Sequence, residues 1–383
     1  MRMNGSMDES KKKKKHRVLP FLLLIAAVLA VVVFAAYRDG TGFDVLRRHF
    51  SYGSSQESGT VQFTYDPSAK NRYAAVGDGL AVLSGTEFRV LDGRGQEVYS
   101  VPVAMENPAL ASGGDRVAAY DVGGTELYVA DLTGELAHLT ADAAEPYISV
   151  NLNEKGWMAV TAKQKGYKGG VTVYNDQLKE AFVFHSSERF VTEACVDGNC
   201  RELAAVTLGQ NDSVFVSSIL LYPLDSEEPR GVWEVSDGLV VSVTERGGQF
   251  AALSDTGLAY SGKDGDGPVY GFAGQFLREY DLGGDDFSVL LLNRYQSGSV
   301  GRLVTVDDAG QEIASLGVSE QVLGVSAAGR YAAVLYSDKL VIYNRDLQEY
   351  ASLTGTDYAR GVLMRADGSA LLLASDSARI FLP

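Results

Sequence analysis

The only two cysteines of this 383-residue sequence, Cys195 and Cys200, lie close enough in the chain to react with each other. They flank Val196-Asp197-Gly198-Asn199, a sequence typical of a tight turn between two strands. In an oxidising compartment this pattern predicts a disulfide at a hairpin tip, and two reduced thiols are the alternative. Two cysteines alone cannot complete a structural zinc site. The spacing also differs from the C-x-x-C of thioredoxin-like proteins.

Few other residues have the spacing that enzyme chemistry needs. The sequence has no G-x-S-x-G, no H-E-x-x-H and no Walker A motif. Its four histidines are His16, His49, His138 and His185. The first two lie beside an apolar segment, and the other two lie on strands that we expect at the outside of the fold. We therefore expect neither a histidine-based triad nor a multi-histidine metal site.

Two glycine-rich segments are weak candidates for ligand binding. Residues 93–97 (Gly-Arg-Gly-Gln-Glu) begin like a dinucleotide motif but lack its third glycine, so we interpret them as a β-turn. Residues 263–267 (Lys-Asp-Gly-Asp-Gly) lack the remaining ligands of an EF-hand, which favours a solvated loop. Asp and Glu are abundant. A catalytic pair of carboxylates is recognised by the distance between its two carboxyl groups, which the sequence alone does not give. We assign no catalytic, cofactor-binding or metal-binding residue.

The elements that would position any site belong to a unit that recurs about every 40 residues after residue 60. The clearest copy has strands over residues 329–334, 340–344 and 348–353, with a turn before the last. The middle strand of this copy recurs along the chain at residues 88–92, 127–131, 171–175, 219–223, 258–262, 303–307, 340–344 and 379–383. The strand before it repeats a pair of alanines, which suits strands crowded around an axis. This period predicts an all-β fold, a β-propeller of four-stranded blades.

The two ends of the repeat predict how the ring closes. The last unit has strands over 359–364, 369–374 and 378–382 but lacks a fourth. Residues 61–65 form one unassigned strand, which would complete the last blade and cover two sheet edges. We expect eight blades, with seven as the alternative, because the first strand of the sixth unit is hard to find before Phe287. A β-sandwich or two smaller β domains would explain short strands but not so long a repeat.

The amino terminus predicts a membrane anchor. Residues 18–37 are almost wholly apolar, long enough to cross a bilayer, and follow a run of lysines at residues 11–15. The positive-inside rule places residues 1–17 in the cytoplasm as a basic tail and residues 61–383 outside the cell membrane. A cleaved signal peptide is the alternative, although its apolar core would be shorter.

Residues 38–60 join the anchor to the ring. Within them, residues 43–50 fit either a short amphipathic helix at the membrane surface or a linker turn. Residues 51–59 are rich in Ser and Gly and fit a flexible stalk. Residues 1–17 carry a net charge of +5 and the whole chain −15, so the remainder carries −20. Such an acidic ectodomain argues against nucleic acid and anionic lipid as partners.

Three carboxyl-terminal segments resemble an uncharacterised bacterial family of single-pass, membrane-anchored β-propellers: residues 329–334 with 340–344, residues 362–370, and residues 378–381. That resemblance extends to the basic flank, the anchor and the whole ring, and it implies the fold and the topology but no catalytic residue. A more distant likeness to quinoprotein-type eight-bladed propellers rests on residues 227–233, which end in Trp233. The chain lacks the adjacent cysteines of the quinoprotein dehydrogenases, so no cofactor is implied.

These observations favour a binding or scaffold module for an envelope protein or a cell-wall ligand. The alternative is an extracytoplasmic enzyme, a carboxylate-based lyase or hydrolase, with its site at the mouth of the propeller channel. Carboxylates that converge in the channel with raised pKa values would favour the enzyme. A flat or grooved face with exposed Tyr and Phe would favour binding.

Overall fold

A computed structural model of the chain describes residues 60–211, 214–235, 238–262 and 265–383, together with residues 24, 25, 27, 28, 31 and 48. It separates into two compact units, Met1–Gln56 and Glu57–Pro383. The predicted tail, anchor and stalk lie outside the described residues apart from those isolated positions and residue 60. No helix among the described residues is long and apolar enough to cross a membrane.

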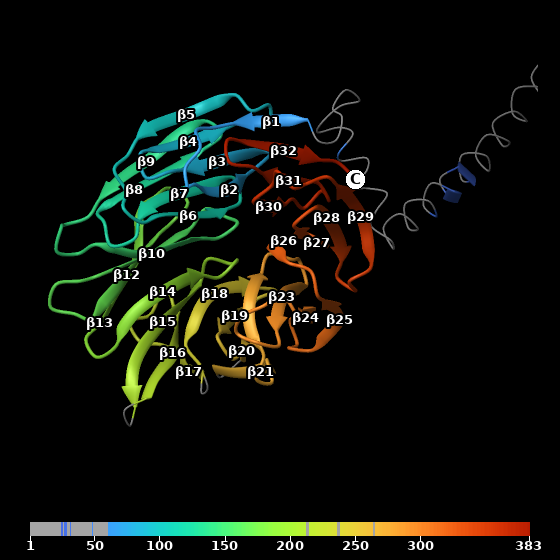
Figure 1. Ribbon diagram of the computed structural model, residues 1–383. Coiled ribbons are helices and arrows are strands. Elements are labelled where there is room, and N and C mark those ends of the chain that lie inside the picture. Colours follow the sequence, from blue (N-terminus) through green and yellow to red (C-terminus); the bar gives the residue numbers. More distant parts are fainter. Residues whose placement is uncertain are drawn as a thin grey trace, which may run out of the picture. The chain divides into compact units, whose positions relative to one another are not determined.

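Within the described residues, thirty-two strands form eight four-stranded antiparallel sheets arranged as the blades of a ring (Figure 1). Blades 1 to 4 are, in order from the axis outward, β2 (Arg72–Val76), β3 (Gly79–Leu83), β4 (Glu87–Leu91), β5 (Glu97–Pro102); β6 (Pro108–Gly113), β7 (Arg116–Asp121), β8 (Glu126–Asp131), β9 (Gly134–Thr140); β10 (Tyr147–Leu152), β11 (Met158–Ala162), β12 (Gly169–Tyr174), β13 (Glu180–Ser186); and β14 (Phe190–Val196), β15 (Glu202–Asn211), β16 (Val214–Pro223), β17 (Gly231–Val235).

Blades 5 to 8 follow the same plan. They are β18 (Val240–Arg246), β19 (Gln249–Ser254), β20 (Gly257–Gly262), β21 (Gly265–Gly271); β22 (Phe276–Asp281), β23 (Phe287–Asn293), β24 (Gly301–Asp307), β25 (Glu312–Val318); β26 (Val322–Ala328), β27 (Tyr331–Tyr336), β28 (Lys339–Asn344), β29 (Glu349–Thr354); and β30 (Gly361–Met364), β31 (Ala370–Leu373), β32 (Ser377–Phe381), β1 (Val61–Thr64). The predicted propeller is confirmed, and the number of blades is eight.

The amino-terminal strand closes the ring as predicted. Strand β1 pairs antiparallel with β32, so the first strand of the ring is the outermost strand of the last blade. Phe63 on β1 is fully buried. The Tyr65 hydroxyl, just after β1, donates to the carbonyl oxygen of Ser377 at 2.7 Å. This pairing covers an edge of β32 that would otherwise expose its backbone groups.

The core lies between neighbouring blades. Ala332 on β27 packs in a cluster with Phe287 of blade 6, whereas Ala333 packs in a cluster with Val362 of blade 8. The repeated alanines lie on the second strand from the axis, the strand before the third, as expected. There they let the sheets on both sides approach closely, which explains poor strand formers at these positions.

Most turns between the third and fourth strands repeat one local structure. Asp92 Oδ1 accepts from the backbone N–H groups of Arg94 (2.9 Å) and Gln96 (2.8 Å), and Asp307 and Asn344 repeat this pattern. The predicted turn over residues 93–97 is thus confirmed. Gly95 has φ of +75°, and a Cβ there would meet the Gln62 carbonyl oxygen at 1.8 Å. Only glycine fits this position, beside β1.

Candidate functional site

The two faces of the ring differ in their connections. On one face, short turns join the first strand of each blade to the second, and the third to the fourth; we call it the tight-turn face. The other, the loop face, carries the connections from each blade to the next and the turns between second and third strands. The described chain enters at β1 and leaves after β32 on the tight-turn face, because β1 runs antiparallel to β32.

Exposed apolar side chains gather on the loop face. Phe190 is 54% exposed, Phe276 44% and Tyr295 59%. The other large apolar side chains exposed on this face are Val122, Tyr167, Val214, Phe215, Leu239, Val241 and Val300. None of the large apolar side chains exposed in the described ring lies in a turn of the tight-turn face. An apolar concentration on one face is typical of an interaction surface.

Two cavities in the loop face flank the inner strand of blade 6. The larger, about 1050 Å³, lies at the seam between blades 5 and 6, and its apolar wall includes Val241, Phe276 and Tyr280. The smaller, about 340 Å³, lies at the seam between blades 6 and 7. Arg278 and Asn293 line both cavities. We call the two cavities together the blade-6 groove.

The shared wall of the blade-6 groove carries polar groups that have no hydrogen-bond partner among the described residues. Arg278 is exposed and makes no hydrogen bond or ion pair with any residue that the structure describes. Asn293 is only 3% exposed, and its Nδ2 donates to the Gly298 carbonyl oxygen at 2.8 Å. Its Oδ1 has no hydrogen-bond partner among the described residues. Buried amide oxygens are usually satisfied, so this acceptor is unusual.

Two carboxylates on inner strands, Glu193 and Glu279, have raised pKa values for separate reasons. Burial raises the pKa of Glu193 on β14 to about 8, opposed by the Val243 N–H that donates to its carboxyl group. Burial likewise raises the pKa of Glu279 on β22, with the adjacent Arg278 opposing the shift. Neither pKa is raised by the other carboxylate. In the described residues, no group of three His, Cys, Asp or Glu side chains could hold a metal ion.

The charge of Glu193 nevertheless acts on two tyrosines of other blades. Its charge raises the pKa of Tyr120 and of Tyr280, although burial is the larger cause for both tyrosines. The Ser242 hydroxyl is hydrogen-bonded to Tyr280. The carboxyl group of Glu193 on β14 thus interacts with residues of β7, β18 and β22, which the sequence did not reveal.

Both cysteines are free thiols in the structure. They flank a turn between β14 and β15, as expected, and the disulfide between them stays a prediction. Cys195 is buried in a cluster with Trp233 and Phe250 between blades 4 and 5. Cys200 has φ of +60°, and its Sγ accepts from Asn153 Nδ2 of blade 3 at 3.4 Å. The two sulfur atoms thus contact neighbours on opposite sides of blade 4.

The two histidines of the ring lie where the sequence placed them, on outermost strands. His138 on β9 stacks on Tyr128 with ring centroids 4.1 Å apart, and His185 on β13 stacks on Tyr167 at 4.7 Å. They lie on the outermost strands of the neighbouring blades 2 and 3, and each ring stacks on a different tyrosine. Of the glycine-rich segment 263–267, Lys263 and Asp264 lie outside the described residues.

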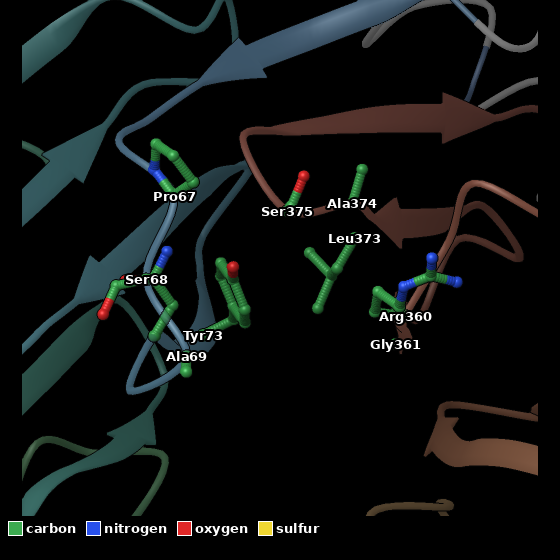
Figure 2. Close-up of a pocket in the computed structure, with 10 residues that line it drawn as sticks. Pro67, Ser68, Ala69, Tyr73, Arg360, Gly361, Leu373, Ala374 and Ser375 are labelled. Carbon is green, nitrogen blue, oxygen red and sulfur yellow. The ribbon is translucent and has the colours of Figure 1, made fainter.

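A third cavity, about 560 Å³, lies at the seam where the ring closes. Figure 2 shows Tyr73 between the segment Pro67–Ala69 and the turn that contains Ser375, with Arg360 at the far side. Arg360 already donates to the carbonyl oxygen of Asp357 at 3.2 Å. This cavity therefore offers a weaker site for a charged ligand than the blade-6 groove.

Solved structures share the fold. The C-terminal WD40 domain of Sif2 is 14% identical with a TM-score of 0.60, and the match covers 85% of this chain and 99% of that one. A quinohemoprotein alcohol dehydrogenase, ADHIIG from Pseudomonas putida HK5, is 10% identical with a TM-score of 0.55, covering 84% and 75%. The dihydro-heme d1 dehydrogenase NirN is 14% identical with a TM-score of 0.50, covering 76% and 67%. At such identities the likeness shows the fold alone.

Sequence comparison identifies the family. None of the curated proteins matches the chain. A family model described as a family of unknown function, DUF5711, matches residues 48–253, which include β1 and the strands of blades 1 to 4. This match spans more than half of the sequence and agrees with the resemblance to an uncharacterised propeller family. The chain belongs to the family of unknown function DUF5711.

Proposed function

We propose that this chain is a binding or scaffold module that docks an envelope protein through the loop face of its propeller. In this proposal residues 18–37 anchor the chain in the cell membrane, residues 1–17 are cytoplasmic and the ring is extracytoplasmic. The observation that carries the proposal is the gathering of exposed apolar and aromatic side chains on the loop face. Aromatic side chains are enriched in protein interfaces.

The surface chemistry supports a protein partner over the alternatives. The ring belongs to a strongly acidic sequence, which opposes binding to nucleic acid and to anionic polymers. A standard interface buries about 800 Å² on each partner. The exposed apolar residues of the loop face are spread over blades 2 to 6. Propellers of the WD40 class, such as that of Sif2, have the same fold, and this analogy raises the expectation of a protein-interaction role without fixing a partner.

The alternative function, a carboxylate-based lyase or hydrolase, is supported by one residue. Burial raises the pKa of Glu193 on the inner strand β14 to about 8, as a general acid requires. Such chemistry needs a second carboxylate or base close by, and no carboxylate raises the pKa of Glu193. Binding therefore has the broader support.

Site-specific crosslinking in cells tests the docking role. A photoreactive amino acid is placed in the full chain at Phe190 or Tyr295 on the loop face, or at Arg94 or Gln177 on the tight-turn face. We expect one discrete protein adduct from both loop-face positions and none from the tight-turn positions. A Phe215→Ser change in the chain labelled at Tyr295 should reduce the yield. Equal labelling from both faces, or no adduct from the loop face, would remove the basis for the proposal.

A further inference from the structure

We propose that the blade-6 groove binds an extended peptide segment of the protein partner, one that presents an apolar side chain near a carboxylate. This inference rests on the proposed docking function and names the chemistry that the docking site selects. The apolar part would lie against Phe276 and Val241, and the carboxylate would pair with Arg278.

The larger cavity provides the apolar half of this site. Phe276 is 44% exposed and Val241 50% exposed, although Phe272 between the same blades is fully buried. Phe276 and Val241 begin the inner strands of neighbouring blades, so their side chains form a wall at the mouth of the seam. The cavity of about 1050 Å³ is large enough for several side chains. An apolar side chain inserted there would remove exposed aromatic surface from water.

The charges along the groove select a carboxylate. Three described charged side chains line the two cavities, Asp255, Arg278 and Glu320. Asp255 Oδ1 accepts from the Leu239 N–H at 2.8 Å, and Glu320 forms an ion pair with Lys339 Nζ at 2.9 Å. Arg278, between the cavities, makes no such contact with the described residues. An arginine fork binds a carboxylate with two parallel hydrogen bonds, so the complementary ligand group is an anionic oxygen pair.

The polar wall favours a peptide backbone beside that carboxylate. Asn293, nine-tenths buried in the wall that both cavities share, has an amide oxygen with no partner among the described residues. Gln296 lines the larger cavity and Gln321 the smaller one. These amides can both donate and accept, as a peptide backbone requires. A partner segment that crosses from one cavity to the other would pass Arg278 and Asn293 in turn.

Defined peptides test the inference on the purified full chain in detergent. The probes are labelled Gly/Ser-rich dodecapeptides in three sets. One set has an internal Phe and Asp at separations of one to four positions and an amidated end; another has Phe near a free terminal carboxylate; the third replaces Asp with Asn and has an amidated end. The anisotropy of each labelled peptide is followed as the concentration of the chain is raised to about 1 mM, where a Kd of that order gives half saturation. We expect saturable binding by a carboxylate-containing peptide and at least about tenfold weaker binding by its carboxylate-free match. The first two sets distinguish a side-chain carboxylate from a terminal one.

Variants of the chain locate the site. Arg278→Ala should lower the affinity for the tightest-binding peptide about tenfold or more, and Arg278→Lys should restore part of that loss. Phe276→Ala should lower the affinity only through the loss of its apolar contact. Arg330→Ala is the matched control, because Arg330 is also exposed but lies on the tight-turn face. Equal binding with and without the carboxylate, no saturable binding in any set, or equal effects of Arg278→Ala and Arg330→Ala would overturn the inference. If crosslinks from Phe190 and Tyr295 persist in that case, the docking function stands without this peptide site. If those crosslinks are also absent, the docking function fails.

Discussion

Replacing Glu193 with Gln should make the ring more stable at alkaline pH and remove most of the pH dependence that this residue causes. In the folded ring, burial raises the pKa of the Glu193 carboxyl from 4.5 to about 8. A carboxyl group whose pKa is raised on folding stabilises the fold most below its unfolded pKa. That stabilisation is lost as the pH rises toward its pKa in the folded state. The contribution of Glu193 to the free energy of unfolding therefore falls between about pH 4.5 and about pH 8 and stays constant above that pH.

The magnitude follows from the size of the shift. Each pKa unit corresponds to about 1.4 kcal/mol, so a shift of about 3.5 units sets a ceiling of about 5 kcal/mol. Glu193 keeps partial access to water in the channel. Screening by that water lowers the expected loss to about 2 to 3 kcal/mol between pH 5 and pH 9. Gln keeps an oxygen that can accept from the Val243 N–H and carries no charge at either pH.

The assay is denaturant and thermal unfolding of the compact unit Glu57–Pro383, followed by the fluorescence of Trp157 and Trp233 at pH 5, 7 and 9. The parent and Glu193→Gln should have similar stability at pH 5, and the variant should be more stable at pH 9. Glu234→Gln, on an exposed position of β17, is the matched control and should follow the parent at every pH. Parallel pH profiles for the parent and Glu193→Gln would refute the assignment of a buried, proton-bearing carboxyl group.

Three further predictions concern closure, thiols and topology. A ring that begins at Asp66 lacks β1 and the buried Phe63, and it should lose several kcal/mol and melt at a lower temperature than one that begins at Ser58; equal melting temperatures would contradict closure by β1. Cys200 should react with a maleimide in the native chain without reductant, whereas Cys195, buried and with its thiol pKa raised by burial, should react only after unfolding. Protection of both thiols until a reductant is added would instead establish the disulfide. Protease outside intact protoplasts should remove the ring and leave a short amino-terminal stub, and replacing Lys11–Lys15 with Glu should impair or invert insertion; full protection before lysis would reverse the proposed orientation.

The repeat made most of the fold predictable because the same contacts recur in each blade. The third strands, such as β8 and β28, are buried on both sides between blades, so their apolar runs stand out in the sequence. Strand β22 does not stand out in the sequence, because its residues alternate between exposed and half-buried and include Arg278 and Glu279. The cysteine spacing predicted the turn correctly but could not fix which side of the blade each sulfur faces.

The candidate site was less predictable because it belongs to no single segment. Val241, Phe276 and Asn293 come from different strands and meet only when blades 5 and 6 lie side by side. Arg278 has no hydrogen-bond or ion-pair partner among the described residues, and Glu193 is half-buried. Both properties depend on side chains from other blades and not on the neighbours of these residues in the chain. A repeat predicts what its copies share, whereas this site depends on how one copy differs from the others.

The strand that was hardest to find is also the strand that forms the groove. An inner strand usually packs against the blades on both sides, and β26 and β30 do so with buried or half-buried side chains. Strand β22 instead leaves Phe276 44% exposed and Tyr280 38% exposed and places Arg278 where no described group pairs with it. The exposed parts of Phe276 and Tyr280 do not gain the free energy that burial of apolar surface provides. Positions that depart from the pattern of a fold concentrate at functional sites. There a bound partner buries the apolar surface that the isolated fold leaves exposed. Variants at Phe276 and Arg278 should therefore weaken binding while leaving the melting temperature of the ring unchanged or higher.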